Sequence, residues 1–259
     1  MVEPASKYTE LNAMIAGATT PPAPLPDVGR LEHQGYRVIP ILGLRVMNTD
    51  ADARGPDPAW HLAVIGKGVD VLINGTFTYD LPNRYHMNPV GTVLRNGGLE
   101  AVGLDRSWAR GGVAILQDGT VVIGRSQGNS EAEVQAVYGE GDRTVRDFMG
   151  GGALLIEYGQ PVSSHDLREL QGFTSGQGGI AATQLQKSDH CVFGIRKGQA
   201  YALWATARTG RDIRADLLDF GFSAAVKFAG GSAAFLRDKT GFVAQGTNSV
   251  GFGIKLRKF

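Results

Sequence analysis

Four short segments centred on glycine, each beside an apolar, strand-like run, constrain the fold of this chain most. Glycine lets the backbone turn tightly at the end of a buried strand. Loops that follow buried strands gather on one side of an α/β or α+β domain, and sites are built there. We therefore expect four strand ends, at residues 74, 152, 194 and 230, to converge around a common pocket. The segments are VDVLINGTF (69–77), GGGALLIEYGQPV (150–162), CVFGIRKGQAYAL (191–203) and AAVKFAGGSAAFL (224–236).

The glycine content indicates many turns between short strands. Glycine makes up 37 of the 259 residues, about twice the roughly 7% of an average chain, without a collagen-like repeat. We predict an α+β fold of strand-rich mixed sheets, with several hairpins and a few helices. The hairpin turns are expected at Asn96-Gly97, Asp118-Gly119, Tyr158-Gly159 and Lys197-Gly198. Helices are expected over residues 58–68, 131–141 and 208–222.

The first 34 residues differ in composition from the rest and are predicted to form an N-terminal arm. Residues 6–16 have the pattern of one short helix. Residues 18–30 include four prolines within six positions, which favour an extended linker that adds no strand to a sheet. Two interpretations stay open: a disordered leader, or an arm that docks on a neighbouring subunit. Residues 35–259 then form one domain, which begins with a strand pair or one bent strand over residues 36–46.

Composition and charge argue against several classes of function. Lys and Arg total 26 and Asp and Glu total 25, a net charge of +1, so no net field favours nucleic acid or an anionic membrane. No apolar run approaches the ~20 residues of a membrane helix, and no signal peptide is visible, which predicts a chain that folds in the cytoplasm. The sequence lacks phosphate-loop, zinc and nucleophile-elbow motifs, so we expect no cofactor and no metal. Cys191, the single cysteine, is expected to be a small buried hydrophobic residue.

The glycine-centred segments, read in order, resemble those of the phosphodiester glycosidase family. The family has an Asn-Gly-Gly-Phe-Phe segment after a buried strand, which stands here as Asn74-Gly75-Thr76-Phe77-Thr78. Its Pro-x-Gly, Gly-Gly-Gly-Pro-Leu-Leu, Arg-Thr-Ala-Ile-Gly and Asn-Leu-Asp-Gly-Gly-Gly-Ser segments are matched in turn by residues 89–91, 150–155, 190–194 and 227–232. The likeness runs from residue 36 to residue 256, although no single motif is strict. It implies the family's fold and an activity on sugar phosphodiesters.

Two ionic groups of the family pattern are missing from this chain. Where the family has Asp before its glycines, this sequence has Ala229 or Phe228, depending on the alignment, and neither is a carboxylate. The Arg of the family's fourth segment is replaced by His190. Cleavage of a glycosidic or phosphodiester bond needs a proton donor and a group that stabilises the developing charge. The comparison with the family therefore implies weakened or lost catalysis.

The remaining polar residues of these segments are the candidates for a site. Asn74, His190 and Glu157 are the catalytic candidates, and each also has a structural interpretation. Asn74 could be a turn residue, Glu157 a solvated carboxylate, and His190 a surface residue at a strand edge. The substrate-binding candidates are Gly75, Asp80, Gly151, Gly152, Gly230, Gly231 and Ser232. Of these, Asp80 could instead cap a loop and Ser232 could simply start a strand.

Two functions are consistent with these residues. In the first, the domain has kept its fold as a catalytically weak or inactive scaffold and serves as a structural or glycan-binding component of a phage tail or baseplate. Its partners would be other virion proteins or further copies of itself, joined through the N-terminal arm, and a cell-surface glycan. Its location would be the virion, assembled in the host cytoplasm, with a purely cytoplasmic location as the alternative. In the second, an active glycosidase hydrolyses a sugar-1-phosphodiester or related bond in a cell-surface polysaccharide.

Overall fold

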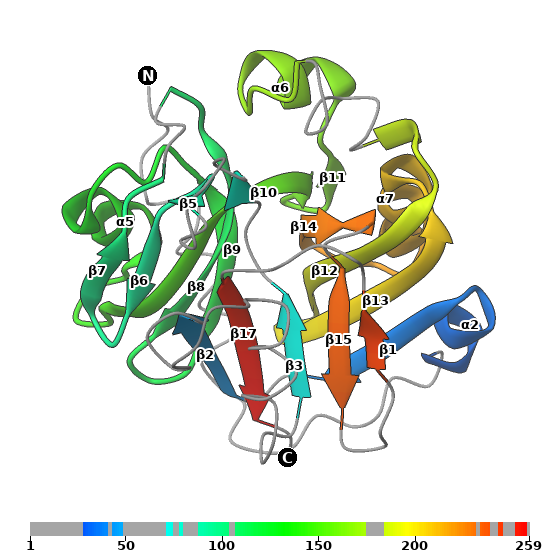
Figure 1. The fold of residues 1–259 in the computed structure, drawn as a ribbon, viewed down its shortest axis with the longest axis horizontal. Helices are drawn as coiled ribbons and strands as arrows, with labels where there is room; N and C mark the ends of the chain where they lie inside the picture. The colour runs from blue at the N-terminus through cyan, green and yellow to red at the C-terminus, as the bar shows by residue number, and fades with distance from the viewer. Residues whose placement is uncertain are drawn as a thin grey trace.

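The fold is seen in a computed structural model of the chain (Figure 1). The structure describes residues 28–40, 43–48, 71–74, 78–79, 88–103, 107–174, 184–231, 234–238, 243–245 and 252–257. The helices expected over residues 6–16 and 58–68, and most of the proline-rich linker, lie outside these residues. Within the described part of the chain, no helix is long and apolar enough to cross a lipid bilayer.

A ten-stranded antiparallel sheet forms the larger part of the fold (Figure 1). Its main path runs β1-β13-β12-β14-β10-β6-β7, while β8 and β11 also pair with β10, and β9 pairs with β8. The long strand β10 belongs to both halves of this sheet, because its first part pairs with β6 and β8 and its last part with β14 and β11. The strands are β1 (Tyr36–Pro40), β6 (Val93–Arg95), β7 (Gly98–Ala101), β8 (Arg110–Leu116), β9 (Val121–Ser126), β10 (Val145–Glu157), β11 (Gln160–Pro161), β12 (Ser188–Arg196), β13 (Gln199–Arg208) and β14 (Ala224–Gly230).

A second, five-stranded sheet has the order β16-β15-β3-β17-β2, and β4 and β5 form a separate two-stranded sheet. The segment over residues 36–46 therefore forms two strands, but they belong to different sheets. The strands are β2 (Gly43–Asn48), β3 (Val71–Asn74), β4 (Thr78–Tyr79), β5 (Asn88–Pro89), β15 (Phe235–Asp238), β16 (Val243–Gln245) and β17 (Phe252–Arg257).

Helix α7 (Gly210–Asp219) packs on the large sheet and confirms the helix expected over residues 208–222. Thr209 caps its N-terminus in a capping box with Asp212. Ile213 and Leu217 are buried on the face that lies against the sheet. Gly221, with a φ of +75°, follows the helix end, as a residue in the left-handed region commonly does. The other described helices are α2 (Val28–His33), α5 (Glu131–Tyr138) and α6 (Ser164–Glu169).

The predicted hairpins are confirmed, and their backbone angles explain the turn sequences. Asn96 and Gly97 have φ values of +55° and +82° between β6 and β7. Two positive values in succession are the geometry of the two-residue hairpin turn that Asn-Gly favours. The turns at residues 118–119, 158–159 and 197–198 likewise join antiparallel strands, and each contains a glycine with positive φ. The prediction of a strand-rich α+β fold is therefore confirmed.

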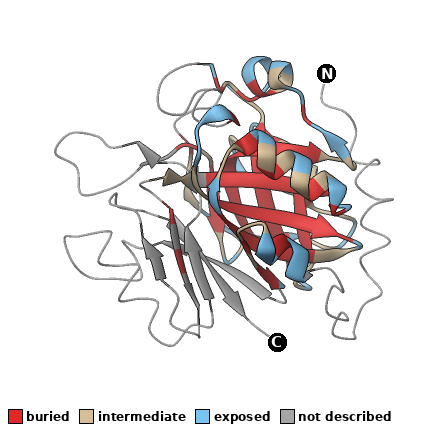
Figure 2. Cartoon of the chain, turned by 90° about the vertical axis from the view of Figure 1, so that its right-hand side faces the viewer, coloured by how far each residue is buried: buried red, intermediate tan, exposed pale blue. Residues whose placement is uncertain are grey.

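The hydrophobic core lies on both sides of the large sheet. Figure 2 shows buried residues along its central strands and alternating burial on the helices that lie against it. Cys191 is fully buried, as expected for a small hydrophobic residue. Leu31 of α2 and Leu236 of β15 belong to the same core cluster, so the first described helix and the second sheet both pack on the large sheet.

Candidate functional site

Two of the four predicted strand ends are not strand ends. Gly152 lies inside β10 and Gly194 inside β12, whereas Asn74 ends β3 and Gly230 ends β14. The interior glycines are required by close packing: a Cβ at Gly194 would lie 2.6 Å from the ring of Phe222. The prediction that glycine marks a turn at all four positions is therefore wrong.

The strand register places the glycine segments at two different levels of the sheet. On β14, Gly230 pairs with His190, whereas Ala225, five residues earlier, pairs with Gly194. Five residues of a strand span about 17 Å. Glu157 follows the β10 residue that pairs with Ala225, so it also lies at the Gly194 level. The structure therefore separates Glu157 from His190 by about 17 Å along the strands.

The glycine triplet of β10 lies at an irregularity of the sheet. The register between β10 and β8 shifts between Met149 and Gly152, and Gly151 has a φ of +88°. Gly91 packs directly on this irregularity, because a Cβ there would lie 2.1 Å from both the carbonyl carbon of Gly150 and the nitrogen of Gly151. Such close approach of two backbones is possible only where both carry glycine. Two segments that carry the family resemblance, residues 89–91 and 150–152, thus meet here.

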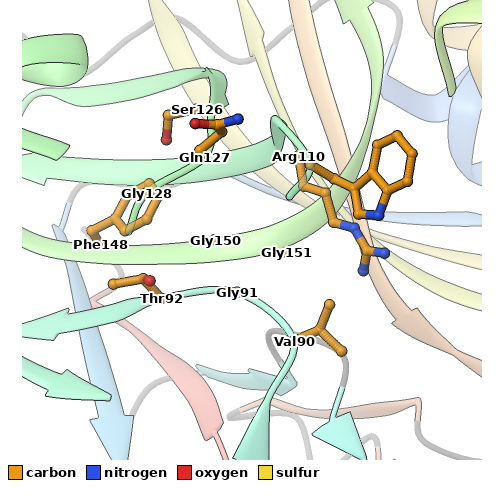
Figure 3. A pocket seen from close by; sticks show the side chains of 11 residues that line it. Val90, Gly91, Thr92, Arg110, Ser126, Gln127, Gly128, Phe148, Gly150 and Gly151 are labelled. Carbon is orange, nitrogen blue, oxygen red and sulfur yellow. The ribbon is translucent and has the colours of Figure 1, made fainter. Parts of the chain in front are cut away.

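A small pocket at this irregularity is the candidate functional site (Figure 3). Its cavity volume is ≈ 10 Å³, about the room of one water molecule. Figure 3 shows the guanidinium of Arg110 beside Gly151 and Val90, with Ser126 and Gln127 farther along the pocket. The lining residues are Val90, Gly91, Thr92, Trp108, Arg110, Ser126, Gln127, Gly128, Phe148, Gly150 and Gly151.

Arg110 is held in the pocket wall by the segment that follows α6. The backbone N–H of Ala109 donates to the carbonyl of Leu170 (3.0 Å), and Nε of Arg110 donates to the carbonyl of Gln171 (2.9 Å). The guanidinium carbon of Arg110 lies 4.7 Å from the ring centroid of Phe173, which is a cation–π distance. Arg110 is 9% exposed, so its position is set by these contacts and not by solvent.

The same segment, residues 170–173, also fixes Trp108 and the neighbouring strand. We call it the 170–173 clamp. A Cβ at Gly172 would lie 2.4 Å from the indole of Trp108, so the ring rests on the glycine backbone. The fully buried side chain of Gln171 accepts from the N–H of Leu154 (2.8 Å) and donates to its carbonyl (3.3 Å). The Gln171 amide thereby pairs with β10 as a strand would, next to the point where β8 begins.

His190 is a buried residue of a central strand, so the interpretation as a surface residue is wrong. It is 2% exposed, and Nε2 lies 3.0 Å from the carbonyl oxygen of Arg208 and 3.1 Å from Oγ of Ser188. Because a carbonyl can only accept, Nε2 carries the proton and donates. Its other ring nitrogen lies against Gly230, where a Cβ would approach to 2.3 Å. Burial, together with the positive charge of Lys227, lowers the pKa of His190 to about 3, so the ring is neutral at pH 7.

Lys227 of β14, three residues before Gly230, is a second buried ionisable group close to His190. It is 2% exposed and lies between Val192 and Ala153 of the neighbouring strands. Burial lowers the pKa of its ammonium to about 8, because the low dielectric disfavours the charged form. The proximity of this cation explains in part why His190 resists protonation.

Two further positions singled out in the sequence, Glu157 and Phe228, have structural contacts. Glu157 forms an ion pair with Arg125 (3.0 Å), and its side chain is 16% exposed, so the interpretation as a solvated carboxylate is wrong. Phe228, one of the two positions aligned with the family's Asp, is fully buried and packs edge-on against Phe193, with ring centroids 5.7 Å apart. This position therefore belongs to the core.

Several predicted site residues lie beyond what the structure describes. Gly75, Asp80 and Ser232 are outside the described residues, and for Asn74 only the backbone is described, as the last residue of β3 paired with Gly253. Among the described residues, no group of three or more His, Cys, Asp and Glu could hold a metal ion. The roles assigned to these positions stay predictions.

The sequence analysis did not single out Trp108, Arg110 or Gln171. Trp108 and Arg110 stand at the start of the strand in SWARGGVAIL, and only an aromatic and an arginine two positions apart, before a double glycine, indicate a site. Gln171 has no local signal, because its role depends on contact with a strand 17 positions away.

No family model matches the sequence, and a comparison with curated proteins gives no match. Solved structures do resemble the fold. The catalytic domain of zebrafish N-acetylglucosamine-1-phosphodiester alpha-N-acetylglucosaminidase, auto-inhibited by its pro-peptide, is similar with a TM-score of 0.59 at 14% identity, over 87% of this chain and 73% of that chain.

Two bacterial structures are similar as well. A hypothetical protein from Synechocystis has a TM-score of 0.54 at 13% identity, over 86% of this chain and 59% of that one. An exported-protein candidate from Burkholderia pseudomallei has a TM-score of 0.59 at 11% identity, over 83% of this chain and 71% of that one. At identities this low, the likeness concerns the fold alone. The chain therefore has a phosphodiester glycosidase-like fold.

Proposed function

We propose that this chain is a phosphodiester glycosidase-like domain that binds a glycan and has little or no hydrolytic activity. The observation that carries the proposal is the state of His190, which replaces an arginine of the family pattern. Its Nε2–H donates to the carbonyl of Arg208, and Gly230 packs against its other ring nitrogen. Its pKa of about 3 keeps the ring neutral at pH 7. A neutral, buried imidazole is poorly suited to protonate a leaving group at pH 7.

The position of Glu157 supports the same conclusion. Glycoside hydrolysis ordinarily needs two carboxyl groups about 5–10 Å apart. Glu157 lies about 17 Å along the strands from the Gly230 level, and Arg125 already pairs with it. It therefore cannot act together with a group at the end of β14.

The proposal is tested by assaying the purified chain for two properties. We expect no release of sugar from a panel of sugar-1-phosphodiesters above the buffer rate, and measurable binding to at least one class of surface polysaccharide on a glycan array. Turnover that is lost in Asn74→Ala would instead support the active glycosidase. Absence of both binding and turnover would contradict a role in glycan recognition.

We place the domain in a phage tail or baseplate, where a glycan-binding surface would meet a bacterial envelope and the N-terminal arm would join copies of the chain or other virion proteins.

The end of the arm is well anchored: Leu31 of α2 is fully buried, and Arg30 pairs with Asp219 of α7 (2.6 Å). A variant that lacks residues 1–27 retains Arg30 and Leu31 and therefore both of these contacts. We expect light scattering to give an oligomer for the full chain and a monomer for the shortened one; the same mass for both would argue against self-association through the arm.

A further inference from the structure

We propose that Asn96 is a site of deamidation that stays protected as long as the tip of the β6–β7 hairpin is docked on β10. The tip is the Asn96-Gly97 turn, and the residues that hold it are Arg146 and Asp147. The proposal concerns a chemical modification of the chain itself, so it is independent of the proposed glycan-binding function. It rests on the reactivity of an Asn-Gly pair and on two hydrogen bonds of the folded chain.

An asparagine that is followed by glycine loses its side-chain amide without an enzyme. The backbone nitrogen of Gly97 gives its proton to water or hydroxide and bonds to the side-chain carbonyl carbon of Asn96. The bond from that carbon to the side-chain nitrogen breaks, the nitrogen takes up a proton and leaves as ammonia, and a succinimide ring remains. Water then opens the ring to aspartate or isoaspartate, so one water is consumed for each ammonia released. Glycine permits the reaction because it has no side chain beside the attacking nitrogen.

The hairpin tip lies where such a reaction could occur. The sequence contains two Asn-Gly pairs, at residues 74–75 and 96–97, and the structure describes both residues of the second pair. Strands β6 and β7 lie at one end of the large sheet (Figure 1), and Asn96 is exposed between them. The group that must react is the backbone N–H of Gly97, so the contacts of this N–H decide how fast Asn96 is lost.

The backbone nitrogen of Gly97 is engaged in the folded chain. Its N–H donates to the carbonyl of Arg146 of β10 at 2.6 Å. The N–H must give up this hydrogen bond before it can lose its proton, and the carbonyl then loses its partner as well. The reaction therefore requires the tip to lift from β10 first.

A carboxylate beside the turn adds to the protection. The backbone N–H of Asn96 donates to Oδ1 of Asp147 at 2.9 Å, and Oδ2 of Asp147 accepts from Nε of Arg146 at 2.8 Å. Asp147 is fully buried, so its charge acts through a low dielectric. This negative charge opposes the loss of a proton from the next nitrogen along the chain, because that loss creates a second negative charge nearby.

Deamidation would prevent the tip from docking again. It places a carboxylate on residue 96, whose N–H is bound by Asp147, and the two negative charges repel each other. Isoaspartate also carries the chain through its side-chain carbon, which adds a backbone atom to a turn that depends on two successive positive φ values. The modification is therefore irreversible, and it marks chains whose hairpin has opened.

The test follows deamidation by mass spectrometry of proteolytic peptides during incubation at mildly alkaline pH. The folded chain is compared with the chain in urea, where Asn74 reports the rate of a second unprotected Asn-Gly pair. We expect Asn96 to react about thirtyfold more slowly in the folded chain, which is the effect of two hydrogen bonds that must break first. Equal rates for Asn96 in the two samples would overturn the proposal.

Two variants test the role of the carboxylate, with folding checked by thermal unfolding. Asp147→Asn removes the negative charge and weakens the contact with the N–H of Asn96, so it should speed deamidation of the folded chain about fivefold. Glu100→Gln is the matched control, because it makes the same change of charge on β7 of the same hairpin, where the carboxylate pairs with Arg95 (3.2 Å). It should leave the rate at Asn96 unchanged. Equal rates in the two variants would show that Asp147 does not protect the turn.

Hydrogen exchange of the unchanged chain gives a second measurement that needs no variant. Base-catalysed exchange removes the same proton of Gly97 that deamidation requires. We expect this amide to exchange slowly although Gly97 is only half-buried, because the tip must open for exchange to occur. Exchange at the rate of an unfolded chain would overturn the proposal, even if Asp147→Asn does not fold.

Discussion

Replacing Gly91 by alanine should destabilise the fold by about 3 kcal/mol or more, because the new methyl group has no space. Its Cβ would lie 2.1 Å from Gly150 and Gly151, and both contacts are backbone atoms of β10 that no rotamer change can move aside. The substitution should force the Gly91 segment away from β10 and open the pocket. Urea unfolding measures the loss of stability, and binding on the glycan array should be lost with it.

The matched control is Gly29→Ala. Gly29 lies in α2, no atom is within 4 Å of a Cβ built there, and it is not among the glycines with positive φ. Alanine is favoured over glycine inside a helix by up to ~1 kcal/mol, so this variant should be neutral or slightly more stable. Equal stability of the two variants would mean that the approach of Gly91 to β10 is not needed for the fold.

Stability should fall steeply as the pH is lowered from about 6.5 toward 3, and His190 should account for a large part of the fall. The pKa of His190 is about 3 in the folded chain and about 6.5 in an unfolded one. Between these values the unfolded chain binds a proton that the folded chain does not, so unfolding is favoured as the pH decreases. The contribution is fully present above pH 6.5, and its size is on the order of 5 kcal/mol.

The measurement is the free energy of unfolding in urea between pH 7 and pH 4. His190→Gln removes the titrating group and should flatten the curve in this window, although it also lowers stability at pH 7 by disturbing the contacts with Arg208 and Gly230. His165→Gln, at an exposed position of α6, is the matched control and should follow the unchanged chain. An unflattened curve for His190→Gln would show that His190 becomes protonated without unfolding.

Features that depend on neighbours in sequence were predictable, and features that depend on distant contacts were not. The Asn96-Gly97 hairpin and the capped helix α7 follow from local signals, since turn angles and capping involve residues within a few positions. Gly152 and Gly194 cannot be told from turn glycines in the sequence. They are glycines because a side chain would collide with Val226 and Phe222, and these contacts exist only in the folded chain.

The candidate site was predictable only in part, for the same reason. The glycine triplet and the Pro89-Val90-Gly91 segment were recognised in the sequence, and they do meet at the pocket. The burial of His190 depends on the strands on either side of it, and the sequence around it does not distinguish a central strand from an edge. The 170–173 clamp was missed because its partners are 17 to 64 positions away in the chain.

The strand β10 has a consequence for how this protein responds to a ligand. Its first residues pair with β6 and β8 and its last with β14, and the Gln171 amide bridges it between the two. Because both halves of the large sheet share β10, we expect them to unfold together in one cooperative step. A molecule seated beside Gly150 and Gly151 would therefore raise the melting temperature of the whole domain, including parts that it never touches.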